Sequence, residues 1–181
     1  KQHKNDIIIV FSDAEELGLN GAALFVTQHP WAKEVGLALN FEARGSSGPS
    51  YMLMETNKGN AGLVNEFSKA GVTYPVSNSL MYSIYKMLPN DTDLTVFREK
   101  GNIQGLNFAF IDDHYNYHTQ QDDAQHLAKN TLAHQGRYLM PLLTYFSNAN
   151  LDAVQATEDE VYFTIPFTFI SYPFSWVLPM T

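Results

Sequence analysis

The apolar run IIIVF (residues 7–11) is followed at once by SDAEELGLNGA (residues 12–22). Five consecutive apolar and mostly β-branched residues predict a short strand that is buried on both faces of a parallel sheet. Glycines then break the pattern, and a helix is predicted over residues 21–28. Glu15 and Glu16 would therefore lie at the carboxyl end of a central strand, where open α/β sheets bind their ligands.

Two adjacent glutamates suit a hydrolytic metal site. One carboxylate can bind a cation while the other accepts a proton from the attacking water. A solvated acidic turn, or carboxylates stabilised by the dipole of the following helix, would also explain the dipeptide. The glutamate pair by itself therefore leaves the metal site and the acidic turn open.

Two further strand ends carry groups that can bind a metal. Residues 36–45 are predicted as a second strand, which ends in the carboxylate of Glu42. Residues 105–111 are predicted as a third strand, and the polar segment after it contains His118. Together with Glu16 these residues form an oxygen, oxygen and nitrogen set that suits zinc.

The order of the predicted elements indicates an α/β fold. Strand-like and helical segments alternate, which predicts a three-layer α/β/α sandwich around a mixed, mostly parallel sheet. A fourth strand is expected over residues 51–56, after a loop over residues 45–50. Further helices are expected over residues 60–70, 79–88 and 124–146, the last despite Pro141.

The composition is that of a globular protein with a hydrophobic core, and it excludes some kinds of ligand and partner. A chain of 181 residues with 45% hydrophobic residues can bury a sizeable core without disulfides. It contains no cysteine, which excludes thiolate ligands, so a metal would be bound by carboxylate and imidazole groups. The formal net charge of −8 argues against nucleic acid as a partner.

Long stretches of this sequence resemble one enzyme family. These stretches are NDIIIVFSDAEELGLNGA (5–22), HPWAKEV (29–35), LNFEARGSSGPSYMLMET (39–56), NDTDLTVFREKGNIQGLNFAFI (90–111) and YHTQQDD (117–123). The family is that of the co-catalytic dizinc aminopeptidases of the MH clan, and the most similar branch is that of the endoplasmic reticulum metallopeptidases and vacuolar membrane proteases. The resemblance implies two zinc ions and a peptide substrate. It also implies Glu15 as the general base, Glu16 and His118 as ligands of one metal, and Glu42 as a ligand of the other.

One family motif has no counterpart in the sequence. Members carry a His-x-Asp motif upstream of the glutamate pair, which supplies one terminal ligand and the carboxylate that bridges the two metals. The only upstream histidine here is His3, and no aspartate stands two residues after it. We therefore expect residues 1–160 to be the C-terminal part of a zinc peptidase domain. Taken alone, this part should bind at most one zinc weakly and be inactive.

Two other functions use a similar scaffold. A glutaminyl cyclase carries out intramolecular acyl transfer with one zinc ion, and a peptidase-like interaction domain keeps the fold without its metals. The presence of Glu15, Glu16, Glu42 and His118 together favours the peptidase, because a decayed site would not need all four.

Four further residues have both a structural and a functional interpretation. Tyr117 could donate to a developing oxyanion or satisfy a hydrogen bond in the interior. Arg44 could bind a substrate carboxylate or hold nearby acidic groups in place, and we favour the second role. Asp93 could receive the substrate's amino group or stabilise a turn. Asp122 could orient an imidazole or cap the following helix.

The end of the chain is apolar and aromatic. Residues 161–180, VYFTIPFTFISYPFSWVLPM, carry no charge, and their length suffices for a membrane span. Their prolines and aromatic residues also suit an interfacial segment, or an edge strand packed on the domain. We therefore treat residues 161–181 as an edge strand or the approach to a membrane span. The resemblance implies that the protein lies on the extracytoplasmic side of that membrane, which is the periplasm, the cell exterior or an organelle lumen.

Overall fold

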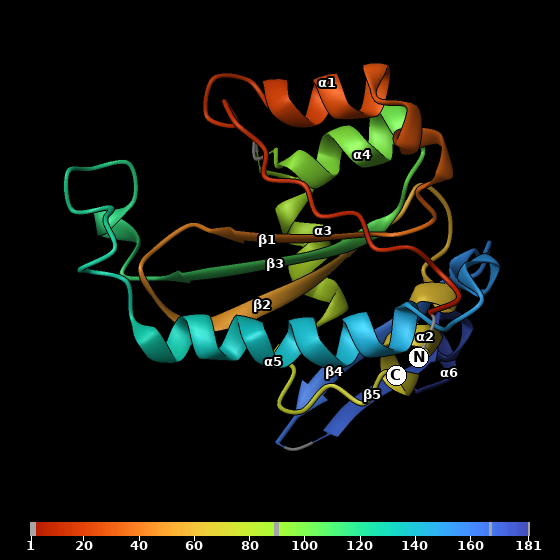
Figure 1. The fold of residues 1–181 in the computed structure, drawn as a ribbon. Coiled ribbons are helices and arrows are strands. Elements are labelled where there is room, and N and C mark those ends of the chain that lie inside the picture. The colour runs from red at the N-terminus through yellow and green to blue at the C-terminus, as the bar shows by residue number, and fades with distance from the viewer. Residues whose placement is uncertain (1–2, 89–90, 167, 181) are drawn as a thin grey trace.

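The central sheet has three strands in the order β1-β3-β2 (Figure 1). The computed structural model describes residues 3–88, 91–166 and 168–180. β1 (Ala38–Ala43) runs parallel to β3 (Gly105–Asp112), and β2 (Ser47–Glu55) runs antiparallel to β3. The α/β class and the mixed sheet are thus confirmed. The sheet has one parallel and one antiparallel pair, so it is not mostly parallel among the described strands.

β1 and β3 carry the same tripeptide, Leu-Asn-Phe, and the two copies pair in register. Residues 39–41 lie opposite residues 106–108, so like side chains are neighbours across the pair. Phe41 and Phe108 stack with ring centroids 4.6 Å apart. Because side chains along a strand alternate between faces, this register gives the sheet one apolar and one polar face.

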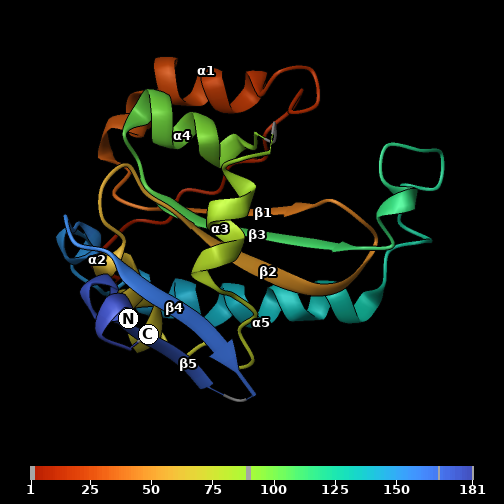
Figure 2. The same cartoon turned by 180° about the vertical axis from the view of Figure 1, so that it is seen from behind.

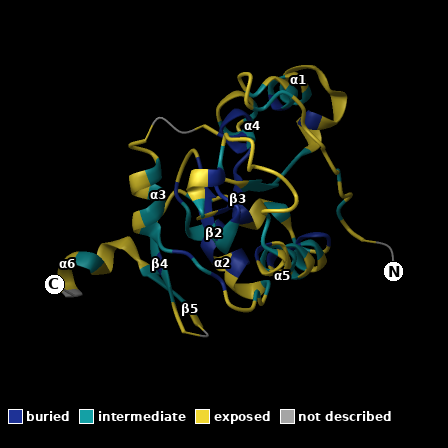
Figure 3. Cartoon of the chain, turned by 90° about the vertical axis from the view of Figure 1, so that its left-hand side faces the viewer, coloured by how far each residue is buried: buried dark blue, intermediate teal, exposed yellow. Residues whose placement is uncertain are grey.

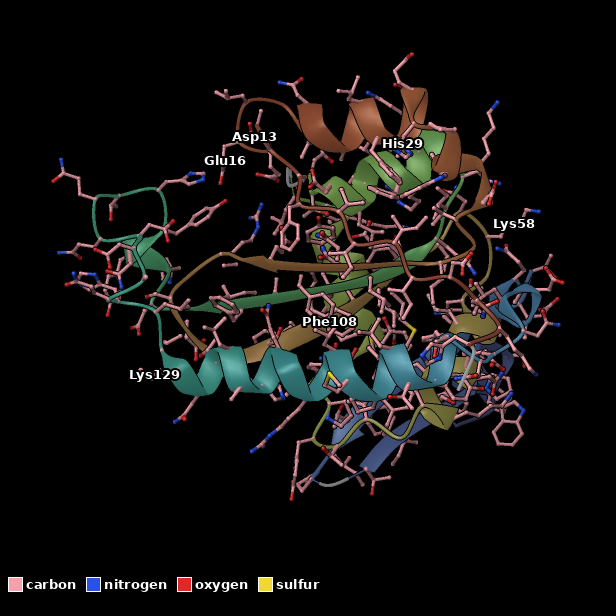
Figure 4. The ribbon with its side chains drawn as sticks, viewed as in Figure 1. Asp13, Glu16, His29, Lys58, Phe108 and Lys129 are labelled. Atoms are coloured by element: carbon pink, nitrogen blue, oxygen red, sulfur yellow. The ribbon has the colours of Figure 1, made fainter. Side chains whose placement is uncertain are left out.

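The apolar face of the sheet forms the core with α5 (Lys129–Phe146) and α2 (Ala61–Lys69). The Tyr138 ring of α5 lies 4.7 Å from the Phe108 ring, measured between centroids, and Figure 4 shows Phe108 between the strands and α5. The buried residues of this core are Met52, Met54, Leu63, Val64, Phe67, Leu106, Phe108, Tyr138, Leu142, Phe146, Val154 and Tyr162.

The polar face of the sheet is covered by α4 (Asp93–Gly101). The polar side chains on this face include Asn40, Glu42, Glu55 and Asn107, with Leu53 and Ala109 between them. Two contacts fix α4 over them: Asn107 Nδ2 lies 3.4 Å from the hydroxyl of Thr92, the residue before the helix, and Arg98 Nε lies 3.5 Å from a Glu55 carboxylate oxygen. Helices thus contact both faces of the sheet, while the complete three-layer sandwich stays a prediction.

Most predicted helices are present with shifted ends. α1 (Asn20–Gln28) packs on α4, and in Figure 2 these two helices lie on the side of the sheet away from α5. α3 is Ser79–Tyr85, and α5 begins at Lys129 rather than at residue 124. Short 3₁₀ helices cover Pro30–Glu34, His114–Asn116, Leu151–Val154 and Phe174–Trp176.

The loop predicted over residues 45–50 is partly wrong. β2 already begins at Ser47, which pairs with Asp112, and the register then shifts before Ser50. Gly48 in this irregular stretch has a φ of 87°, which glycine adopts without strain. The turn-like composition of the segment therefore reflects a bulged strand, which bends without leaving the sheet.

The strand predicted over residues 7–11 is absent from the structure. The N-terminal residues lie against the end of α5, where Asn5 Nδ2 donates to the carbonyl of Phe146 over 2.7 Å. Residues 7–11 then run as coil past β1 (Figures 1 and 2). Ile9 and Phe11 are 74% and 93% exposed, and the yellow stretch near the N-terminus in Figure 3 includes this coil. None of the described residues forms a β-ladder with this run, and an apolar run without a partner strand stays coil.

The C-terminal segment forms a hairpin of its own. β4 (Glu160–Ile165) and β5 (Thr168–Pro173) pair in a separate two-stranded antiparallel sheet, and α6 (Val177–Met180) follows. β4 contacts the body of the domain through Tyr162, which is 1% exposed. Within the described residues, no helix has the length and apolar character needed to cross a membrane.

Candidate metal centre

Glu15 and Glu16 lie in a tight turn that leads into α1. The backbone N–H groups of Gly18 and Leu19 both donate to the carbonyl of Glu15, over 3.0 and 2.8 Å. Ala14 adopts a left-handed φ of 57°, a conformation that side-chain-bearing residues adopt at a cost in energy. The turn therefore fixes the backbone positions of both glutamates just before α1.

Glu16 and His118 are brought together from segments about a hundred residues apart. His118 Nε2 lies 2.8 Å from Glu16 Oε1, and both side chains remain more than half exposed. Figure 4 shows Glu16 at the turn before α1, on the side of the loop that follows β3. The Tyr117 ring stacks on the His118 imidazole with centroids 3.8 Å apart, and the Tyr117 hydroxyl lies 3.5 Å from Glu16 Oε1.

Glu15 is half-buried next to these two residues. Burial raises the pKa of its carboxyl, and the negative charges of Glu16 and Asp93 raise it further. The positive charge of Arg44 and that of a protonated His118 act in the opposite direction. A carboxylate with a raised pKa holds an abstracted proton more readily, which suits a general base.

Asp93 is the first residue of α4 and lies close to Glu15. The hydroxyl of Ser12 donates to Asp93 Oδ2, which ties α4 to the segment before the glutamate pair. Asp93 Oδ1 is buried and has no hydrogen-bond partner among the described residues. A buried carboxylate oxygen without a donor is a site where a cationic group can bind favourably.

Glu42 lies near the end of β1 on the polar face of the sheet. Burial raises the pKa of its carboxyl to about 7, although the hydrogen bond from Asn107 and the charge of Arg44 lower it. Asn107 Nδ2 donates to Glu42 Oε1 over 3.1 Å. The charge of Glu15 raises the pKa of Glu42, so the two carboxyl groups share one electrostatic environment.

The raised pKa of Glu42 predicts a pH dependence of folding in the metal-free protein. Between pH 4.5 and about 7 the folded chain retains a proton on Glu42 that the unfolded chain has released, so the free energy of unfolding falls as the pH rises. Glu42→Gln should remove the part of this fall that Glu42 causes and raise the free energy of unfolding above pH 7 by up to about 3 kcal/mol, while Glu15 and Glu55, whose pKa values are also raised, keep their smaller parts. Urea denaturation at a series of pH values, with Glu34→Gln at an exposed carboxylate as control, measures the effect. Equal pH profiles for Glu42→Gln and the wild type would contradict it.

Arg44 and Asp122 lie beside the candidate site, and their roles stay predictions. The charge of Arg44 lowers the pKa of Glu42, Glu15 and Tyr117, which agrees with the role of holding acidic groups in place. Asp122 Oδ2 accepts from the backbone N–H of His118 over 3.4 Å and so contacts the main chain rather than the imidazole. It does not cap α5, which begins seven residues later.

Two buried polar residues beside the site, Asn107 and Glu55, were not among the residues predicted from the sequence. Asn107 is fully buried in the middle of β3, and Glu55 at the end of β2 is 1% exposed. Asn107 Nδ2 lies 3.3 Å from Glu55 Oε1, so this amide contacts two carboxylates. The sequence contained one signal that could have identified Asn107, which is an asparagine inside the otherwise apolar strand GLNFAF. A polar residue at a buried strand position needs hydrogen-bond partners.

The arrangement fits a metal ion in its chemistry. Glu16 and His118 offer an oxygen and a nitrogen at one point, which are donor types that zinc accepts. Among the described residues, no three histidine, aspartate or glutamate side chains are grouped closely enough to hold a metal by themselves. Glu42 thus lies in the same electrostatic environment without joining Glu16 and His118 in one cluster.

Comparison with known proteins matches most of the chain to one peptidase family. Residues 1–143 match the model of peptidase family M28. The chain is 30% identical to human endoplasmic reticulum metallopeptidase 1 over 173 residues, which are 92% of this chain and 19% of that protein. It is 32% identical to a vacuolar membrane protease of Candida albicans over 180 residues, which are 96% of this chain and 19% of that protein.

The chain spans less than a fifth of the length of these two relatives. No solved structure matches it. The family model nevertheless covers Glu15, Glu16, Glu42 and His118, which all lie within its matched residues. The chain belongs to peptidase family M28.

Proposed function

We propose that the full-length protein hydrolyses peptide bonds with zinc and releases N-terminal residues. The observation that carries the proposal is the Glu16–His118 pair beside the half-buried Glu15. Membership of a peptidase family, and relatives that are named metallopeptidase and protease, support the same chemistry.

Each residue has a defined task in this proposal. Glu16 and His118 would hold one zinc ion and Glu42 a second. When bound, the ions would polarise the scissile carbonyl and acidify the attacking water. The Glu15 carboxylate accepts the proton of that water and returns it to the leaving amine. The Tyr117 hydroxyl, close to Glu16, can donate to the oxyanion as it develops.

The preference for a free amino terminus rests on Asp93. Its buried Oδ1 lacks a hydrogen-bond partner among the described residues, and its other oxygen is fixed by Ser12. An ammonium group beside Asp93 would gain a charge-assisted hydrogen bond, which an internal peptide N–H offers only weakly. Peptides with a free amino terminus should therefore be better substrates than N-acetylated ones.

Turnover and metal content of the full-length protein test the proposal together. We expect hydrolysis of aminoacyl p-nitroanilides that stops on chelation and returns when zinc is added. Cyclisation of N-terminal glutamine without hydrolysis would instead assign a glutaminyl cyclase. A zinc-free protein without turnover would assign an interaction domain, and both results would overturn the proposal.

We also propose that the full-length protein is membrane-associated, with this domain on the extracytoplasmic side. Relatives named for the endoplasmic reticulum and the vacuolar membrane support this placement. The exposed side chains of Phe174, Trp176 and Leu178, just after the β4–β5 hairpin, would suit a membrane interface. Protease protection of the tagged domain tests this placement in sealed vesicles that keep their cytoplasmic face outward. The domain should resist the protease until detergent is added. Digestion without detergent would place the domain on the cytoplasmic side.

A further inference from the structure

Asn107 occupies a position that an apolar residue would ordinarily fill. It lies in the middle of the central strand β3, between Asn40 of β1 and Leu53 of β2, and it is fully buried. Burying an amide costs free energy unless its donors and acceptor find partners. The partners of Asn107 therefore explain why the strand carries it.

The hydrogen bonds of Asn107 determine which way its amide points. Asn40 Nδ2 donates to Asn107 Oδ1 over 3.0 Å, so the NH₂ group points away from Asn40. It faces Glu42 Oε1 at 3.1 Å and Glu55 Oε1 at 3.3 Å, with the Thr92 hydroxyl at 3.4 Å. The reversed amide would place its oxygen against two carboxylates, which is unfavourable.

The second carboxylate of this network is anchored from α4. Glu55 is 1% exposed, and its Oε2 lies 3.5 Å from Arg98 Nε. Arg98 in turn pairs with Glu99 over 2.9 Å. The chain of contacts Arg98–Glu55–Asn107–Glu42 thus links α4 to β1 across the polar face of the sheet.

We propose that Asn107 is a positioning residue that holds the Glu42 carboxylate in its metal-binding orientation. This inference rests on the proposed function, in which Glu42 binds the second zinc. The hydrogen bond engages Glu42 Oε1, which leaves Oε2 as the oxygen to face the cation. The same amide separates Glu42 from Glu55, because its NH₂ group contacts both of these carboxylates.

Zinc affinities of the full-length protein, measured by competition with a chromophoric chelator, test this role. Asn107→Leu keeps the size of the side chain but removes the donor, and it should weaken one of the two zinc sites by roughly 10- to 100-fold. The other site should keep its affinity. Glu42→Ala should remove the same weakened site, and the double variant should lose no more than Glu42→Ala alone, since Asn107 acts through Glu42.

Leu142→Ala is the matched control for loss of packing. Leu142 is fully buried on α5, on the opposite face of the sheet, so this variant should unfold at a lower temperature yet bind both zinc ions normally. If Asn107→Leu does not fold, Asn40→Leu removes the bond that orients the same amide and should weaken the same site less strongly.

The outcomes separate this inference from the proposed function. Wild-type protein that binds two zinc ions, with Asn107→Leu or Asn40→Leu equal to it at both sites, overturns the role of Asn107 alone. Equal weakening of both sites overturns it as well, because that is the signature of general destabilisation. Wild-type protein without zinc overturns the proposed function, and the role of Asn107 with it.

Discussion

Glu15→Gln is expected to lower kcat of the full-length protein by about 10²- to 10⁴-fold while leaving its zinc content unchanged. Glutamine has nearly the shape of glutamate but cannot accept the proton of the attacking water. The turn around Glu15 is held by backbone hydrogen bonds, so the substitution should not disturb its geometry. The raised pKa of Glu15, caused first by burial, is what a carboxylate needs to hold that proton briefly.

Asp13→Asn is the matched control for this experiment. Asp13 is an exposed carboxylate in the same segment, and its side chain accepts from the backbone N–H of Ala14, a bond that asparagine can also make. The control should keep wild-type turnover. Near-normal activity of Glu15→Gln with an unchanged zinc content would show that Glu15 is not the general base.

Glu16→Ala and His118→Ala should each lower the zinc content of the full-length protein by about one ion per chain. Each variant removes one of two donors that lie 2.8 Å apart, and catalytic zinc sites usually have three protein ligands. Turnover should fall along with the metal. Elemental analysis of the purified variants, normalised to protein concentration, measures the stoichiometry.

His114→Ala controls for changes in the loop after β3. His114 is exposed, lies four residues before His118 and begins the short 3₁₀ helix that carries the chain toward it. This variant should retain the zinc content of the wild type. Unchanged zinc in either Glu16→Ala or His118→Ala would show that the altered residue is not a ligand.

The sequence predicted the elements whose signals are local. The helix α2 and the strands β1 and β3 lie within a few residues of their predicted positions, because periodicity and flanking glycines mark them. The strand predicted over residues 7–11 was wrong because strand formation depends on a partner that a local signal does not reveal. A strand exists only where another backbone pairs with it, and an apolar run says nothing about whether that partner is present.

The residues of the candidate site likewise fall into those that local sequence signals predicted and those that depend on the pairing of the strands. The sequence predicted that Glu16 and His118 each follow the end of a strand, and the structure brings their side chains together even though residues 7–11 are coil. Asn107 and Glu55 could not be assigned in advance. Their importance depends on the register that sets β1, β3 and β2 side by side, and single strands do not reveal their register.

Anomalous diffraction at the zinc absorption edge, from crystals of the full-length protein, would locate the metal ions relative to Glu16, Glu42 and His118. We expect one peak between the Glu16 carboxylate and the His118 imidazole and a second peak at the Glu42 carboxylate. Zinc bound only at other residues, or no peak at these three side chains in enzyme that is active, would contradict this expectation.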